Sequence, residues 1–360
     1  MKYFLVSGEA SGDMHGANLI TAIKERDKEA EFAFFGGDKM QEASGEKPIN
    51  HNKDRAFMGI WEVVVNLNTI RKALIQCKNA IKNYKPDAVI FIDYPGFNLK
   101  IAPFCKELDL PTHYFISPKL WAWNTKRVHK LKRSIDHLYT ILPFETEFYK
   151  QFDYPVDYVG NPLMDEIVKF EKTESNEEKI LALLPGSRGH EIKTMLPTMY
   201  QVSKEYPEYK TIVVGAPNFD KDYYKKILGE EAHLHFGNTY EILSKANAAL
   251  VTSGTATLET GLFKVPQVVC YKFNWLSHLI GKMLIKVKYI SLVNLILDKL
   301  AINELIQYDF TYENVKKELD SILTGDKRIK MLKDYDELIQ IVGGPGAAKR
   351  AATLIVDRLS

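Results

Sequence analysis

Cysteine is scarce in this sequence of 360 residues: there are three, Cys77, Cys105 and Cys270, far apart and without a C-x-x-C pair. An odd, scattered set argues against a disulfide framework and fits a reducing cytoplasm. The nine histidines include no H-x-x-x-H pair and no cluster with cysteine. We therefore expect no metal site and no cofactor held by one.

Long apolar runs are also missing. The first apolar run, "YFLV", has four residues, and acidic Glu9 follows it closely. A signal peptide needs a longer apolar core, and no uninterrupted stretch approaches the roughly 20 residues of a transmembrane helix. These absences predict a cytoplasmic protein that is soluble or at most peripheral to a membrane.

A large excess of one charge is absent, because the formal net charge is +2. Bulk charge therefore does not imply a nucleic acid partner. The charge is uneven, however. Residues 260–297 carry lysines and no acid, and so do residues 110–135, which contain Lys119, Lys126, Arg127, Lys130, Lys132 and Arg133. Both stretches could face an anionic surface.

Short β-rich runs alternate with helix-length segments throughout the chain. This alternation predicts α/β domains with parallel sheets covered by helices on both faces. The stretch "EKTESNEEK" contains no apolar residue and indicates a linker over 171–179. We expect two Rossmann-like domains, 1–170 and 180–345, and a final helix, 346–360, for which we consider packing back on the first domain. Ligands of such domains bind at the carboxyl ends of the strands, here facing a cleft between the domains.

The stretch "SGEASGDMHG" follows the first predicted strand. Its glycines, Gly8, Gly12 and Gly16, fit neither G-x-G-x-x-G nor a P-loop, so a dinucleotide site is disfavoured. What remains is a strand-to-helix loop at a sheet edge that carries polar side chains from Glu9, Ser11 and Asp13. A plain turn with capping residues is the alternative.

A second candidate is Asp93 in "FIDYPGFN". It ends an apolar run, and Pro95-Gly96 forces a turn directly behind it. A carboxylate that is poorly solvated on one side has a raised pKa and is suited to accept a proton. The alternative is an aspartate that caps a helix beginning near Phe97.

Two loops of the second half are suited to a nucleotide. In "LLPGSRGHE", backbone N–H groups at Gly186 and Ser187 and the Arg188 guanidinium would suit a diphosphate, although surface arginines are common in such loops. In "TSGTATLET", a strand runs into Ser253, Gly254 and Thr255 and then a helix, whose start favours phosphate. Glu259 lies one turn later and could accept hydrogen bonds from ribose hydroxyls. A capping box with an exposed glutamate is the alternative.

Two basic segments also contain large apolar side chains. Trp121 and Trp123 lie close to Lys126 and Arg127, a combination that suits single-stranded nucleic acid or an anionic membrane. Core tryptophans on a cleft-lining helix are the alternative. Residues 278–297 mix aliphatic side chains with Lys282, Lys286 and Lys288, which suits a helix at a lipid headgroup boundary or a buried amphipathic helix.

Taken in order, the motifs resemble one family, the lipid-A-disaccharide synthases. The matching stretches run from near residue 5 to about 310. They are "SGEASGD", "FMGIWEVV", "DYPGFN", "SPKLWAW" with Arg127, "LPFE", "LLPGSR" with Glu191, "SGTATLE", "SLVNLI" and "NELIQ". Departures from the usual pattern include Gly96 after "DYP", Asn161 in "VGNPL" and Val293 in "SLVNLI".

The resemblance implies a metal-independent, inverting glycosyltransferase of the GT-B type. The family moves 2,3-diacylglucosamine from UDP to the 6-hydroxyl of 2,3-diacylglucosamine 1-phosphate, and works peripherally at the cytoplasmic face of the inner membrane. Carried over by position, Glu9 and Asp93 are the acidic candidates. The UDP-binding candidates are Arg188, Ser253, Gly254, Thr255 and Glu259, with Asn294 and Glu304 nearby.

Two other functions stay open at this point. A non-hydrolysing UDP-sugar 2-epimerase has the same architecture and UDP loop but needs no lipid acceptor. A non-catalytic nucleotide-binding protein recruited to a membrane would use the Trp–Lys segment. The sequence does not determine the oligomeric state.

Overall fold

The computed structural model describes residues 1–52, 67–123, 125–170, 178–272 and 288–360. The motif "FMGIWEVV", Lys282, Lys286 and residues 171–177 of the expected linker lie outside the described residues. The chain divides into two compact units. The first contains Met1–Pro162 and Gly346–Ser360, and the second contains Leu163–Pro345.

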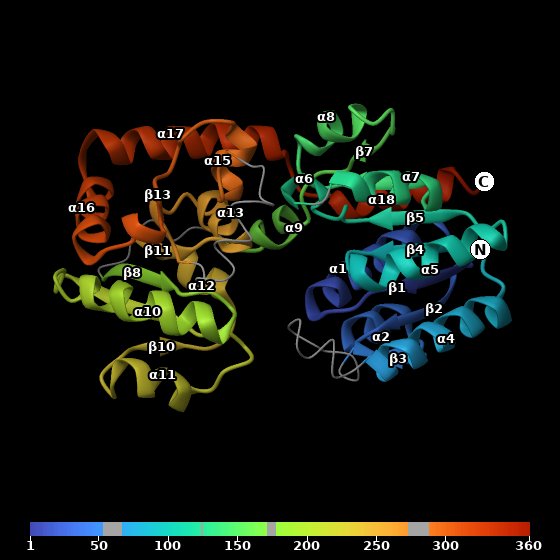
Figure 1. Cartoon of the computed structure of the whole chain (residues 1–360), viewed down its shortest axis with the longest axis horizontal. Helices are drawn as coiled ribbons and strands as arrows, with labels where there is room; N and C mark the ends of the chain where they lie inside the picture. Colours follow the sequence, from blue (N-terminus) through green and yellow to red (C-terminus); the bar gives the residue numbers. More distant parts are fainter. Residues whose placement is uncertain (53–66, 124, 171–177, 273–287) are drawn as a thin grey trace. The chain divides into compact units, whose positions relative to one another are not determined.

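The first unit is built on a seven-stranded parallel sheet with the order β3-β2-β1-β4-β5-β6-β7 (Figure 1). Every side chain of the central strand β4, "AVIFI", is buried, as expected for a strand covered on both faces. The strands are β1 (Lys2–Val6), β2 (Glu31–Gly36), β3 (Asn50–His51), β4 (Ala88–Ile92), β5 (Thr112–Phe115), β6 (His137–Thr140) and β7 (Asp157–Tyr158).

Helices cover both faces of this sheet. Because side chains alternate along a strand, Phe4 packs into the core with α4, α5 and α7, whereas Leu5 packs into the core with α1, α2 and α18. The helices are α1 (Ala10–Arg26), α2 (Asp38–Ser44), α4 (Leu67–Tyr84), α5 (Pro95–Glu107), α6 (Leu120–Trp123), α7 (Val128–Ser134), α8 (Glu145–Lys150) and α18 (Ala347–Asp357), with the 3-10 helix η2 (Thr125–Arg127).

The second unit repeats the plan with a six-stranded parallel sheet in the order β10-β9-β8-β11-β12-β13. Its strands are β8 (Lys179–Leu184), β9 (Tyr209–Val214), β10 (Leu234–His235), β11 (Ala248–Thr252), β12 (Gln267–Tyr271) and β13 (Glu304–Ile306). Its helices are α9 (Leu163–Ile167), α10 (Gly189–Ser203), α11 (Lys221–Leu228), α12 (Thr239–Leu243), α13 (Thr255–Leu262), α15 (Leu292–Leu297), α16 (Tyr312–Leu323) and α17 (Gly325–Val342), with η3 (Gln307–Asp309). The predicted fold class, two Rossmann-like units, is confirmed.

Each sheet has one place where the chain order reverses. In the first sheet this is the β1–β4 pair, and in the second it is the β8–β11 pair. Loops that leave the carboxyl ends of such a pair diverge to opposite faces, and ligands of open α/β sheets bind there. The four loops that follow these strands begin at Ser7, Asp93, Pro185 and Ser253. They contain the stretches that the sequence singles out.

The final helix α18 packs on the first unit, as the sequence analysis considered (Figure 1). Small side chains, Ala348, Ala351 and Ala352, let it approach α1 closely within the buried core. At its end the Arg358 guanidinium makes two hydrogen bonds to the Asp157 carboxylate, at 2.8 and 3.1 Å. This paired geometry fixes the helix end to β7.

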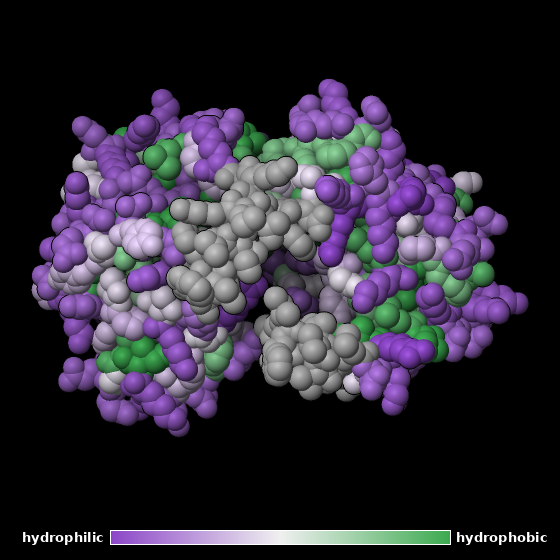
Figure 2. Space-filling view, in the orientation of Figure 1, coloured by the Kyte–Doolittle hydropathy of each residue, from purple (hydrophilic) through white to green (hydrophobic). Residues whose placement is uncertain are grey.

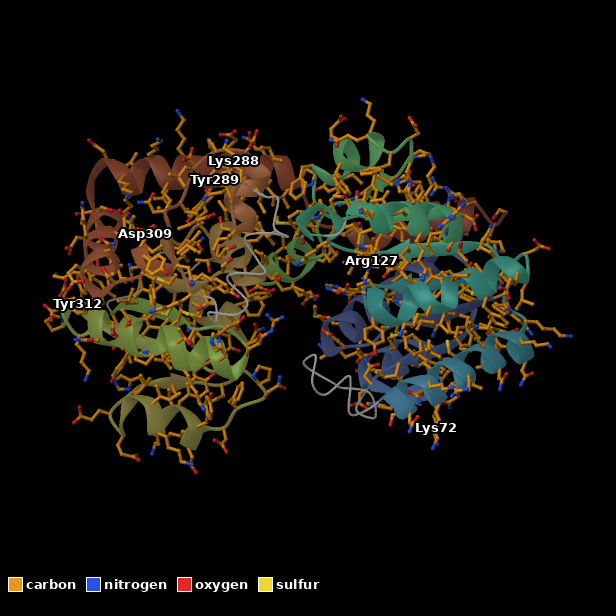
Figure 3. All side chains as sticks on the ribbon, viewed as in Figure 1. Lys72, Arg127, Lys288, Tyr289, Asp309 and Tyr312 are labelled. Atoms are coloured by element: carbon orange, nitrogen blue, oxygen red, sulfur yellow. The ribbon has the colours of Figure 1, made fainter. Side chains whose placement is uncertain are left out.

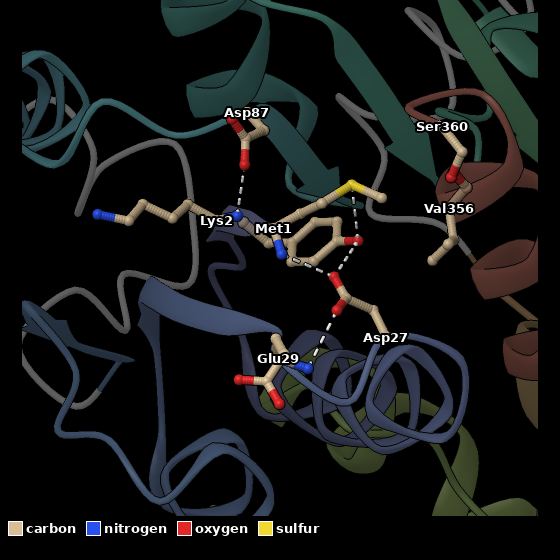
Figure 4. A network of polar contacts seen from close by, with 8 residues as sticks. Met1, Lys2, Asp27, Glu29, Asp87, Val356 and Ser360 are labelled. Atoms are coloured by element: carbon tan, nitrogen blue, oxygen red, sulfur yellow. Dashed lines mark hydrogen bonds and ion pairs between the residues drawn. The ribbon is translucent and has the colours of Figure 1, made fainter.

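A polar network closes the amino-terminal edge of the first sheet (Figure 4). The Asp27 carboxylate accepts hydrogen bonds from the Met1 amino group at 2.9 Å and the Tyr3 hydroxyl at 3.1 Å. Desolvation opposes these contacts, but together they hold the pKa of Asp27 below its usual value. The Asp87 carboxylate likewise accepts the Lys2 N–H at 2.7 Å. These bonds tie β1 to the segments that flank it.

Hydrophilic residues cover most of the surface of each unit on the face shown in Figure 2. Among the described residues, no helix is both long enough and apolar enough to cross a membrane.

Candidate active site

The glycines of "SGEASGDMHG" serve close packing. The loop after β1 is shorter than the sequence predicts, because α1 already begins at Ala10 and contains Gly12 and Gly16. A Cβ on Gly8 would lie 2.2 Å from the Tyr94 ring, and one on Gly16 would lie 2.6 Å from the Met40 sulfur. Gly8 and Gly16 therefore allow close packing: Tyr94 lies against Gly8, and Met40 lies against α1 at Gly16.

The acidic residues of this stretch have different environments. Glu9 and Ser11 are exposed, and Glu9 is the N-cap residue of α1. Asp13 is buried inside α1, and its carboxylate accepts backbone N–H groups of Gly37, Lys39 and Met40 at 2.7, 3.0 and 3.1 Å. The sequence pattern places Asp13 in a strand-to-helix loop, whereas it lies inside α1. It instead fixes the start of α2, which leaves its oxygens occupied.

Asp93 forms a strained turn at the end of β4. Asp93 and Tyr94 both have left-handed backbone conformations, with φ of 44° and 51°, which are costly for non-glycine residues. The turn is held because the Asp93 carbonyl accepts hydrogen bonds from the Asn98 amide at 2.7 Å and the Tyr114 hydroxyl at 2.5 Å. Tyr94, and not Asp93, is the N-cap residue of α5, so the capping alternative does not describe Asp93.

The carboxyl of Asp93 is half-buried and lies among charges from neighbouring strand ends. Burial raises its pKa, and the negative charge of Glu9, which follows β1, raises it further. The Lys119 ammonium, which follows β5, and a hydrogen bond from the Tyr94 backbone act in the opposite direction. An acid with a raised pKa beside one cation is suited to exchange a proton.

The Arg188 loop of the second unit is organised by Glu191. Arg188 is the N-cap residue of α10, and the Glu191 carboxylate accepts the backbone N–H groups of Ser187 and Arg188 at 3.2 and 3.3 Å. Gly186, at φ 97°, leaves room for that carboxylate, since a Cβ would lie 2.5 Å from it. The Ser187 N–H predicted to meet phosphate is thus already bonded, whereas the Arg188 side chain is 75% exposed.

The Ser253–Thr255 loop leads from β11 into α13. Gly254 has φ 154° and ψ −159°, a conformation that other residues rarely adopt. Gly254 and Thr255 are exposed, and the first N–H groups of a helix have no partner within it. The Ser253 hydroxyl donates to the Ile290 carbonyl at 3.0 Å. The loop is therefore fixed on one side and open at the helix start.

Glu259 lies one turn along α13 and is half-buried. Its carboxylate accepts the Tyr240 hydroxyl at 3.1 Å, and burial raises its pKa. The Tyr240 ring contacts Phe170 and Phe263. An aromatic cluster thus holds the glutamate in place.

Asn294 and Glu304 brace a neighbouring segment. The buried Asn294 amide donates to the Ile302 carbonyl and to Glu304, and its oxygen accepts two backbone N–H groups, all within 3.0 Å. The Glu304 carboxylate also accepts the N–H groups of Ile290 and Ser291. The side-chain amide of Asn294 thus makes all of these bonds inside the protein, and a role of Asn294 and Glu304 near UDP stays a prediction.

The residues proposed to contact a membrane differ in their environments. The Trp121 indole N–H donates to the buried Glu145 carboxylate at 3.2 Å, and its ring meets Phe144 edge-on. The Trp121 side chain is half-buried against α8, and a contact with lipid stays a prediction. Lys126 and Arg127 are exposed on η2, and Lys288 lies over the Tyr289 ring ahead of α15 (Figure 3). The Trp123 side chain lies outside the described residues.

Two residues of the first unit were missed as site candidates: Lys119, whose charge acts on Asp93, and Glu145, whose pKa Lys119 also lowers. Lys119 appeared in the sequence only as one cation of a basic run, and Glu145 only as the last letter of "LPFE". Their relevance depends on the strand order β4-β5-β6, which puts the Lys119 segment after β5 between Asp93 and Glu145, and spacing in the sequence does not reveal that order. Within the described ranges, no group of three or more histidine, cysteine, aspartate or glutamate side chains could hold a metal ion.

Two Rossmann-like units, each built on a parallel sheet with one reversal of strand order, have the architecture of the GT-B class. A family model described as lipid-A-disaccharide synthetase matches residues 3–356, and the chain belongs to that family. The lipid-A-disaccharide synthase of Myxococcus xanthus is 34% identical over 374 residues, covering 99% of this chain and 97% of the relative.

Solved structures share the fold at low identity. The glycotransferase of kitacinnamycin has a TM-score of 0.68 at 14% identity, covering 100% of this chain and 99% of that one. The UDP-GlcNAc 2-epimerase of Neisseria meningitidis, bound to UDP-GlcNAc, has a TM-score of 0.62 at 13% identity, covering 100% and 99%. At these identities the likeness concerns the fold alone. The epimerase alternative is therefore not favoured over the family's glycosyl transfer.

The glycine packing beside Asp93 gives a test with an internal control. We expect Gly8→Ala to lower the free energy of unfolding by about 1–3 kcal/mol, because the new methyl group displaces the Tyr94 ring. Gly96→Ala places its methyl group in open space at the start of α5 and should be neutral or stabilising by up to about 1 kcal/mol. Urea unfolding measures both, and equal destabilisation would contradict the packing argument.

Proposed function

We propose that the chain transfers 2,3-diacylglucosamine from UDP to the 6-hydroxyl of 2,3-diacylglucosamine 1-phosphate. The products are the β-1,6 disaccharide and UDP, formed in one inverting displacement. The observation that carries the assignment of roles is the half-buried Asp93 carboxyl at the β1–β4 reversal, in a chain of this family.

Asp93 is the general base in this proposal. It takes the proton of the acceptor 6-hydroxyl while that oxygen bonds to the anomeric carbon of the donor sugar and the bond to UDP breaks. Its raised pKa makes Asp93 a stronger base than an ordinary aspartate. The turn fixes its backbone before the substrate binds, so the carboxylate need not be reoriented during the reaction. Glu9, the second acid at this edge, is the less favoured base.

The second unit holds UDP in this proposal. The start of α13 at Ser253–Thr255 offers unpaired N–H groups and the positive end of a helix dipole to the diphosphate. The exposed Arg188 guanidinium adds a cation for the charge that develops on the leaving group. Glu259, held by Tyr240, accepts hydrogen bonds from the ribose hydroxyls. Asn294 and Glu304 act indirectly, by bracing the segment to which Ser253 is bonded.

Association with the cytoplasmic face of the inner membrane belongs to the same proposal, because both substrates carry acyl chains. The support is the run of exposed cations on η2 and α7, namely Lys126, Arg127, Lys130, Lys132 and Arg133, in a stretch without an acid. Each cation near an anionic surface contributes roughly 1 kcal/mol.

The first prediction concerns the base. Asp93→Asn should fold normally but form disaccharide roughly 10²- to 10⁴-fold more slowly, because the amide cannot take the proton. Mass spectrometry of the products from UDP-diacylglucosamine and the monosaccharide phosphate measures this. Glu9→Gln is the matched control and should retain most turnover. Near-wild-type turnover of Asp93→Asn, with a large loss in Glu9→Gln, would move the base role to Glu9.

The second prediction concerns ribose binding. Glu259→Ala should weaken UDP binding about 10- to 100-fold, since hydrogen bonds to a charged group are lost. Because burial raises the pKa of Glu259, wild-type affinity should also decline on acidification as the carboxylate takes up a proton. Calorimetry measures both effects. Glu241→Ala, an exposed glutamate on α12, is the control, and unchanged affinity in Glu259→Ala would rule out the ribose role.

The third prediction concerns the membrane. Lys126→Glu combined with Lys130→Glu should abolish sedimentation with phosphatidylglycerol vesicles at low salt, whereas wild-type protein sediments and is released as salt rises. Lys221→Glu with Lys226→Glu, the same charge change on α11, should sediment like wild type. If both double variants behave alike, the η2–α7 surface does not contact lipid.

A further inference from the structure

Glu145 is a buried acid that the proposed chemistry does not use. It begins α8, and the residue is 0% exposed. One carboxylate oxygen, Oε2, accepts the backbone N–H groups of Ile141 and Leu142 at 3.1 and 3.0 Å. The other, Oε1, accepts the Trp121 indole N–H at 3.2 Å. A buried carboxylate is costly unless its oxygens are bonded in this way.

These contacts attach α8 to residues 117–121, the segment that leads from β5 into the start of α6. Trp121 lies at the end of that segment and also packs edge-on against Phe144, with ring centroids 4.9 Å apart. At the start of the segment, the Ser117 hydroxyl is bonded to the Tyr149 hydroxyl of α8 at 2.7 Å. Residues 117–121 are therefore held at both ends by α8 side chains.

Lys119 lies in the middle of this held segment. Its positive charge acts on two carboxyls, because it lowers the pKa of both Asp93 and Glu145. The Lys119 side chain is exposed, so its own packing does not fix it. The position of its backbone, and hence of its charge relative to Asp93, depends on the two ends of the segment.

We propose that Glu145 is a positioning residue, which through Trp121 fixes residues 117–121 and thereby holds Lys119 beside Asp93. This inference rests on the assignment of Asp93 as the base. Glu145 acts through other residues and touches no substrate in this scheme.

The arrangement depends on the charge of Glu145. All three of its hydrogen-bond partners are N–H donors, so a proton on the carboxylate finds no acceptor among them and makes its oxygens weaker acceptors for the indole N–H. Burial raises the pKa of Glu145 to about 7, while the backbone N–H groups, Trp121 and Lys119 oppose the rise. Among the described residues, the phenols of Tyr149 on α8 and Tyr158 on β7 also interact with it. The Trp121 bond is therefore expected to be stronger above neutral pH, where Glu145 carries its charge, and weaker below it.

A substrate-free measurement tests the contact itself. The indole N–H resonance of Trp121, identified by its loss in Trp121→Phe, should shift with pH around a midpoint near 7 in wild-type protein. In Glu145→Gln it should not titrate. Glu147→Gln, which changes an exposed acid on the same helix, should titrate like wild type. A wild-type resonance that does not respond to pH between 6 and 8 would overturn the proposal.

Turnover tests the consequence. At pH 8, Glu145→Gln and Trp121→Phe should each lower kcat about tenfold with KM within about twofold, and the double variant should be no slower, because both act through one contact. At pH 6 the wild-type kcat should fall toward that of the variants, so the ratio of wild-type kcat to variant kcat approaches one. A merely structural defect would keep the ratio constant, and that result would overturn the proposal. Trp121→Phe retains the test if Glu145→Gln does not fold.

Failure of this inference is distinguishable from failure of the proposed function. Wild-type turnover in Asp93→Asn would remove the base assignment, yet the indole titration needs no substrate and would still report the Glu145–Trp121 contact. Conversely, if the ratio of wild-type to Glu145→Gln kcat stays constant with pH while Asp93→Asn is inactive, Glu145 has no positioning role but Asp93 remains the base.

Discussion

The reversal of strand order within each parallel sheet is the constraint on which both candidate sites depend. In a parallel sheet the strands all end at the same carboxyl edge, and among the described strands the order reverses at the β1–β4 and β8–β11 pairs, where neighbouring loops turn to opposite faces. Asp93 follows one of these strands and Ser253 follows another. Both residues are only half-buried at these strand ends.

Hydrogen bonding separates the carboxylates that stabilise the fold from those suited to chemistry. Asp13 is satisfied by three backbone N–H groups, and Glu145 by two backbone groups and an indole. Such oxygens have little capacity left for substrate. Asp93 is instead governed by burial and by the charges of Glu9 and Lys119. An acidic residue in these motifs can therefore either stabilise the fold or be suited to chemistry, and the hydrogen-bond donors around its carboxylate show which.

The two levels of comparison answer different questions. Similarity at 34% identity over nearly the whole chain establishes the family, whereas likeness at 13 or 14% to a glycosyltransferase and an epimerase establishes the architecture. A shared Rossmann-like frame does not determine the reaction, because function resides in the residues at the strand ends. The strained Asp93–Tyr94 turn is such a feature, since its cost persists only where the surrounding contacts of Asn98 and Tyr114 support it.

The sequence by itself determined the alternation of strands and helices, the two Rossmann-like units and the loops that carry Asp93, Arg188 and Ser253, because periodicity and glycine positions are local properties. It missed the short strands β3 and β13, which have two and three residues and no clear alternation. Only the tertiary structure decided that Asp13, Asn294 and Trp121 are bonded inward and that Lys119 acts on Asp93. Those outcomes depend on which donors the fold brings within reach of each side chain, and residues such as Asp13 and Gly37, or Trp121 and Glu145, are joined across 24 positions of the chain.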